Sequence, residues 1–198
     1  MKSIKIITGI LLILLFNQTF AQEKGTEEFK IGYGLGTSTQ IMYDIADIFI
    51  TVFTLSGITY EDEKSLGALY INYNYSVSDV ISFGGLVAYE QIKNDVYSNN
   101  LPIGKNTCGF YTIALETEFH YVRNKKFQMY SGLGLAYTYG TLDFDSSTPQ
   151  EKSSNYNLSL FNFNFTGVGF RFGSTFGGFV EFGFGYKGIV NAGLSYQL

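Results

Sequence analysis

The chain has 198 residues with a formal net charge of −4, and it contains 19 Phe, 16 Tyr, 23 Gly, 2 Pro and 1 Cys. A single cysteine excludes an intramolecular disulfide and a cysteine-based zinc cluster, and the acidic balance argues against a nucleic-acid partner. Aromatic residues make up 18% of the chain. Together with many glycines and few prolines, this content favours strands over helices.

The N-terminal segment has the layout of a secretory signal peptide. Lys2 and Lys5 precede an apolar run over 6–16, and 19–21 places small residues at the first and third positions of a cleavage site. The run is too short to span a bilayer, which takes about 20 residues. We predict a signal peptide over 1–21 and a mature domain over 22–198, beginning at Gln22; an uncleaved anchor is the alternative.

Eight segments then alternate apolar with polar or small residues at period 2, as strands with one apolar face do. The predicted strands are 29–35, 69–77, 81–90, 111–121, 127–139, 155–172, 179–186 and 190–198. In the sixth, the aromatic parity changes after Phe165, so we predict a β-bulge at Thr166-Gly167. The alternative places Phe161, Phe163 and Phe165 inside a pocket.

The predicted connections alternate in length. Short ones fall at 78–80, 123–126 and 173–177, and long ones fall at 39–65, 93–108 and 141–154, with a short seventh connection at 187–189 on the long side. An even strand number with this alternation predicts an all-β fold, an eight-stranded antiparallel up-and-down transmembrane β-barrel. Both termini and the basic turn 123–126 are then periplasmic, and the acidic loops 39–65 and 141–154 are extracellular.

The first long connection contains a stretch, 41–53, whose apolar residues recur at helical spacing. These residues are Ile41, Ile45, Ile48, Phe49, Val52 and Phe53. They predict a short helix that caps the barrel mouth or lies on the outer leaflet. A strand extension is the alternative, because Ile48, Ile50 and Val52 also alternate.

The two faces of the predicted strands differ in chemistry. An eight-stranded barrel has a narrow interior that could not hold about 20 aromatic side chains, so we expect the aromatic face to contact lipid. Among the residues expected to face lipid are Tyr73, Phe83, Leu133, Phe182 and Tyr186, whereas Asn72, Ser82, Gly132 and Glu181 are expected in the lumen. The sheet must close, because hydrocarbon leaves unpaired backbone groups unsatisfied.

Two segments, 127–134 (FQMYSGLG) and 177–198, carry a family resemblance. They resemble the small outer-membrane "porin family" β-barrel proteins of Bacteroidetes, and the architecture is similar to the OmpA-type transmembrane domain. The resemblance implies the outer membrane of a Gram-negative cell and no single activity. The apolar ladder from Val190 to Leu198 resembles the C-terminal strand signal read by the barrel-insertion machinery, although the usual final residue there is Phe.

Charged residues on the predicted lumen face form the candidate site. They are Lys30, Glu90, Glu116, Glu118, His120, Arg171, Glu181 and Lys187. Buried charges persist only when paired, so we predict a charge network, with Arg171 and Glu181 pairing across the ladder; a proton or ion path is the alternative. Asp143, Asp145 and Glu151 are interpreted as a solvated acidic loop rather than a cation site.

We therefore predict an integral outer-membrane protein with a structural or surface-interaction role through its loops. We predict neither a metal nor a cofactor. A narrow pore for small solutes is the first alternative. A lipid-modifying barrel enzyme is the second, with His120 as the base that its nucleophile would need; no catalytic residue is predicted. The expected partners are outer-membrane lipid, the barrel-insertion machinery and an unidentified extracellular ligand, with 41–53 as the best candidate for an interaction surface.

Overall fold

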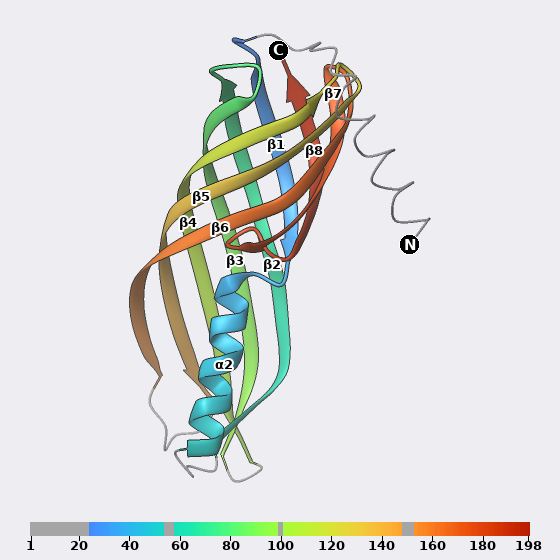
Figure 1. Ribbon diagram of the computed structural model, residues 1–198. Coiled ribbons are helices and arrows are strands. Elements are labelled where there is room, and N and C mark those ends of the chain that lie inside the picture. Colours follow the sequence, from blue (N-terminus) through green and yellow to red (C-terminus); the bar gives the residue numbers. More distant parts are fainter. Residues whose placement is uncertain (1–23, 54–57, 99–100, 148–152) are drawn as a thin grey trace, which may run out of the picture.

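The computed structural model describes residues 24–53, 58–98, 101–147 and 153–198, so the predicted signal peptide lies outside the described residues. Eight strands and one helix follow one another within these ranges: β1 (Glu27–Leu35), α2 (Ser38–Phe53), β2 (Ile58–Ser76), β3 (Ile81–Ser98), β4 (Leu101–Arg123), β5 (Phe127–Ser146), β6 (Ser154–Gly173), β7 (Phe176–Gly185) and β8 (Val190–Gln197). Each strand pairs antiparallel with its neighbours in sequence, and the ring closes between β1 and β8 (Figure 1). The predicted up-and-down eight-stranded barrel is confirmed.

The two ends of the described chain meet where the barrel closes. The register of β1 and β8 places Phe29 opposite Tyr196 and Tyr33 opposite Ala192. The Leu198 amide also donates to the carbonyl of Glu27 at 3.0 Å. The short turns after β2, β4 and β6 lie at the same end of the barrel as these two chain ends (Figure 1).

The barrel is apolar outside and polar inside, as the alternation predicted. The exposed set includes Tyr73, Phe83, Leu133 and Phe182, whereas Asn72, Ser82, Gly132 and Glu181 are buried in the interior. Aromatic ring pairs lie toward both ends of this surface: Phe176–Tyr196 and Phe127–Phe172 near the short turns, and Tyr89–Tyr111 and Tyr137–Phe161 toward the other end. An apolar band between aromatic girdles is the exterior of a barrel that stands in lipid.

The bulge predicted in the sixth strand is present. The pairing of β6 with β7 shifts register between Thr166 and Val168, and Phe165 and Phe172 consequently lie on the same, outer face. The expectation that Tyr186 faces lipid is wrong. β7 ends at Gly185, whose φ of 140° reverses the alternation, and the Tyr186 side chain turns into the lumen, where it is buried.

The wall of the barrel has two heights. β7, β8 and β1 have 10, 8 and 9 residues, whereas β2 to β6 have between 18 and 23. Much of the three connections predicted as long loops is therefore strand, and β3 and β4 pair as far as Ser98 and Leu101. We call the part of β2–β6 that continues beyond β7, β8 and β1 the extension.

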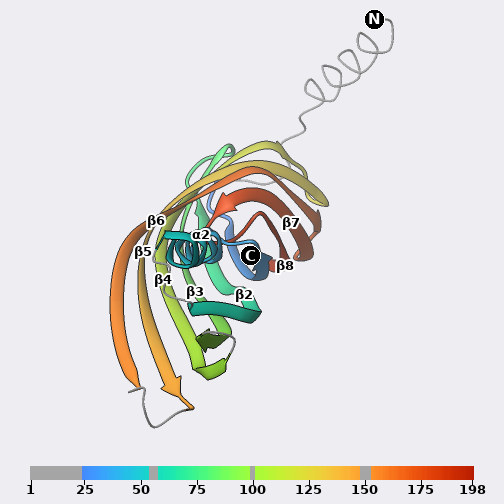
Figure 2. The ribbon, with the colours of Figure 1, turned by 90° about the horizontal axis from the view of Figure 1, so that it is seen from below.

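Helix α2 confirms the helix predicted for the first long connection and lies inside the curve of the extension (Figures 1 and 2). Thr37 caps its first turn, because the Thr37 hydroxyl accepts from the Gln40 amide at 3.0 Å. Tyr43 packs on a small buried cluster of the extension formed by Ile92, Cys108 and Phe110. Within the described ranges, no helix has the length and apolar character to cross a membrane.

Candidate functional site in the barrel lumen

All eight charged residues predicted for the lumen are buried in the barrel. Seven of them lie in or beside a chain of ion pairs. Glu90 lies apart, beneath the start of α2, where its carboxylate accepts from the Thr37 hydroxyl at 2.5 Å. The first turn of the helix and the lumen wall are thereby joined.

Lys30 on β1 is the first centre of the network. Its Nζ lies 2.6 Å from Glu118 Oε1, 3.5 Å from Glu28 Oε2 and 3.8 Å from Glu181 Oε1. It also donates to the Tyr130 hydroxyl at 3.2 Å, and that hydroxyl donates to Glu181 at 2.7 Å. One ammonium thus contacts three carboxylates that come from three different strands.

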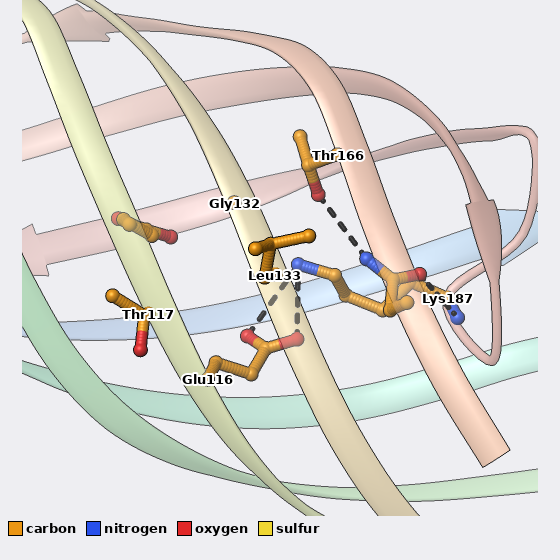
Figure 3. A pocket seen from close by; sticks show the side chains of 8 residues that line it. Glu116, Thr117, Gly132, Leu133, Thr166 and Lys187 are labelled. Atoms are coloured by element: carbon orange, nitrogen blue, oxygen red, sulfur yellow. Dashed lines mark hydrogen bonds and ion pairs between the residues drawn. The ribbon is translucent and has the colours of Figure 1, made fainter.

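Lys187, in the turn after β7, is the second centre. Its Nζ lies 2.9 Å from Glu181 Oε2 and 3.3 Å from Glu116 Oε1. Figure 3 shows the lysine reaching across the lumen to the Glu116 carboxylate. Glu116 also accepts from the Tyr186 hydroxyl at 2.7 Å and from the Asn72 amide at 2.8 Å. Glu181 therefore bridges the two lysines.

Arg171 does not pair with Glu181, which corrects the prediction. The turn between β6 and β7 places Arg171 opposite Phe179 and Glu181 opposite Gly169, so the two side chains lie in different rows. Arg171 Nε instead lies 3.0 Å from Glu28 Oε1 and donates to the Ser195 hydroxyl at 2.7 Å. Its guanidinium also donates to backbone carbonyls of the turn that follows β6.

His120 lies at the end of the network nearest the short turns. Its Nε2 lies 3.3 Å from the Ser82 hydroxyl and 3.5 Å from Glu118 Oε2. In a catalytic triad the nucleophile and the carboxylate contact opposite ring nitrogens, whereas here both lie beside the same one. All three side chains are buried, and this geometry does not support nucleophilic catalysis.

Three tyrosines that fill the lumen each lie against a glycine of another part of the barrel wall. A Cβ atom at Gly32 would overlap the ring of Tyr70, one at Gly134 would overlap the hydroxyl of Tyr186, and one at Gly169 would lie 2.6 Å from the ring of Tyr130. The alternation of Gly with large residues therefore has a packing cause. Small residues of the wall make room for rings that cross a narrow interior.

Two charged residues of the lumen were not predicted from the sequence, and both lie at strand ends. Glu28 shares the parity of Lys30 on β1, but the predicted strand began one residue later. Arg123 was assigned to a turn, whereas β4 continues to it after a register shift between His120 and Val122. Arg123 is buried and donates to the Ser78 carbonyl at 3.0 Å.

The network closes the lumen at its level. The small cavity lined by Glu116, Glu118 and Lys187 is too narrow to hold a water molecule. Four carboxylates and three cationic side chains pair there across β1, β4, β6 and β7. Such a network can hold strands together and exclude water.

Glu151, of the predicted acidic loop, lies outside the described residues.

A closed ring of eight strands with an apolar exterior and a filled, polar interior defines a small transmembrane β-barrel. Comparison with protein-family models and with curated proteins finds no match. Similar solved structures include Ail, the attachment invasion locus protein of Yersinia pestis, in complex with the heparin analogue sucrose octasulfate, at 15% identity and a TM-score of 0.46. A second structure of Ail has 12% identity and a TM-score of 0.44, and each comparison covers 88% of this chain and 99% of that chain.

Proposed function

We propose that this chain is an integral outer-membrane protein whose role is non-enzymatic and lies in surface interaction through the extension and α2. The observation that carries the proposal is the unequal wall. Five strands and a helix continue beyond the closed ring, although spanning a bilayer needs only about 9–11 residues per strand. Structure beyond that length does not serve the crossing of the membrane, so it is available for contact.

The lumen supports this role over the two alternatives. A pore needs a continuous aqueous path, but Lys30, Lys187 and Glu181 join opposite walls of the interior. A lipid-modifying enzyme needs a nucleophile and a base that substrate can reach. The single histidine of the chain is buried beside Ser82 and Glu118.

Location and orientation are tested on cells that express the full chain. We expect the protein in the outer-membrane fraction, with Gln22 as the first residue of the mature form. Single cysteines labelled by an impermeant maleimide, in a Cys108→Ser background, should react at Asn155 in the extension and fail to react at Lys125 in a short turn. Recovery in the soluble periplasm, or the reverse labelling pattern, would contradict the proposal.

The pore alternative is tested separately by conductance. The refolded wild-type protein in a planar bilayer is expected to show no steady ionic current, because the charge network blocks the lumen. A steady current that disappears when the protein is omitted would favour the pore.

The C-terminal ladder from Val190 to Leu198 supports recognition by the barrel-insertion machinery, since Leu194 and Leu198 lie on the exterior.

A further inference from the structure

One edge of the extension lacks a partner strand. β6 pairs with β5 from Ser154 onward, but β7 pairs with β6 only from Asn164 to Gly173. Among the described residues, 154–162 therefore pair with another strand on one side alone, and β6 forms the outer margin of the extension (Figure 2). An unpaired strand edge is not tolerated in hydrocarbon, so this segment stands outside the membrane core if the barrel spans the membrane as proposed.

The backbone geometry identifies which groups face the open side. The Phe163 carbonyl accepts from the Tyr186 amide at 3.1 Å, so it points toward the β7 side. Alternate residues of a strand point their N–H and C=O groups to the same side, and β6 and β5 pair without a register shift over 154–165. The amides and carbonyls of Asn155, Asn157, Ser159 and Phe161 consequently face the open edge.

The two free edges of the extension differ in their protection against pairing. On β2, the residues beyond β1 include 61–64 with the sequence EDEK, and the pairing with β3 shifts register at two places. Charges and bulges are the devices that keep an edge from adding a strand. On β6, 154–170 contains neither a charged residue nor a proline, and the first register shift comes after 154–165.

We propose that the β6 edge over 154–162 is a binding site for an extended peptide segment of another protein, which adds to the sheet as an antiparallel strand. This site rests on the proposed function, because the extension must lie outside the membrane. Inner-face side chains of β6 are apolar, with Tyr156 exposed and Leu158 and Leu160 half-buried. Outer-face side chains are Asn155, Asn157 and Ser159, followed by the exposed Phe161 nearer the barrel. The segment should therefore alternate apolar and polar residues beside 155–159.

The antiparallel direction and the charge at the tip of the extension fix one further feature of the segment. Asp143 and Asp145 lie on β5 near the tip, and the Asp143 carboxylate accepts from the amide of Asn155 on the edge strand itself. On the β4 side, Lys105 lies opposite Asp145 in the ladder, but its ammonium pairs with Asp95 at 3.6 Å. An antiparallel segment ends its chain beside this tip, so basic residues at its C-terminal end complement the site.

A second copy of the chain in the same membrane does not fit the edge. Two copies related by an axis along the membrane normal have their β6 strands running in the same sense. Because barrel strands are tilted by about 35–45°, two such strands cross at about 70–90° and cannot form a ladder. A segment of a different protein has no such restriction.

The test uses the full mature chain in lipid nanodiscs and the peptide Thr-Val-Thr-Val-Thr-Trp-Thr-Lys-Lys. The chain contains no Trp, so the fluorescence of the peptide reports binding. We expect saturable binding by the wild type and by Ser159→Ala. Ser159→Pro should bind at least about tenfold more weakly, because it removes one edge amide and places a ring in the path of the added strand.

Two controls keep the outcome interpretable. Ser159→Pro should show the same gel shift between folded and heated protein as the wild type. If this variant fails to fold, a peptide N-methylated at alternate residues is used in its place. The N-methylated peptide should not bind the wild-type protein. Amide exchange at Asn157 and Ser159 should slow on peptide binding, whereas Leu158, already bonded to β5, should not change. A peptide ending in Glu-Glu should bind more weakly.

Equal binding of the N-methylated peptide, or unchanged exchange at both edge amides, would overturn the proposal. Self-association that Ser159→Pro abolishes would identify a second copy as the occupant and overturn it equally. Outer-membrane location is measured separately by fractionation. If the wild-type barrel is correctly located but does not bind the peptide, the edge site is refuted and the proposed function stays intact.

Discussion

Replacing Lys30 by Met removes the ammonium that contacts Glu118, Glu28 and Glu181 in the interior of the barrel. Methionine fills a similar volume, so the cost comes from charge rather than from a cavity. Removing one partner of a buried ion pair costs about 3–5 kcal/mol, because the remaining charge stays buried without compensation. Three carboxylates lose one cation here, and we expect the loss in unfolding free energy to lie at the upper end of that range.

The assay is reversible urea unfolding of the mature protein in phospholipid vesicles, followed by the gel shift between folded and unfolded forms. Lys105→Met is the matched control, because the Lys105–Asp95 pair has side-chain exposures of 74% and 34% and should contribute about 0–1 kcal/mol. The double variant Lys30→Met/Glu118→Gln should regain about 1–3 kcal/mol of the loss. A loss below about 1 kcal/mol for Lys30→Met would refute the reasoning about the network.

Three further predictions follow from packing and exposure. Gly169→Ala places a Cβ atom 2.6 Å from the ring of Tyr130 and should cost about 1–3 kcal/mol in the same assay, whereas Gly178→Ala, whose nearest neighbour would lie 3.7 Å away, should stay within about 0.5 kcal/mol of wild type. Leu133→Arg on the lipid-facing surface should cost about 2–4 kcal/mol, and Leu133→Ala should cost less. Burial raises the pKa of the Cys108 thiol to about 11, so maleimide should label Cys108 at pH 7 only after unfolding; rapid labelling of the folded protein would contradict its position beneath α2.

Alternation predicted the strands well where one face contacts lipid and the other the lumen, because the two environments select opposite residue types. β1, β7 and β8 belong to this part, and their predicted limits differ little from the observed ones. The extension has water or α2 on its faces, so Lys93, Asn94 and Asp95 follow no simple alternation although they lie within β3. The prediction of a long loop at 93–108 failed for that reason.

The candidate site was predicted as a set of residues but not as a set of pairs. Side-chain parity decides whether Arg171 points inward, and it does. Pairing depends in addition on the centre of the turn, which lies at Thr175, midway between the paired Gly173 and Gly177, rather than at Phe176. A shift of this kind moves Glu181 out of the row of Arg171, and no sequence pattern in the strands themselves reports it.

The lumen network also constrains the order in which the barrel can assemble. Lys30 lies 88 residues from Glu118 in sequence, and the last strand supplies Ser195 to Arg171. A sheet that has entered lipid before β1 meets β8 would carry charges without their partners into a water-poor interior. Insertion and closure must therefore proceed together, with neutralisation of the interior as a late, cooperative event, and folding should be slow for a chain of this length because its decisive contacts are distant in sequence.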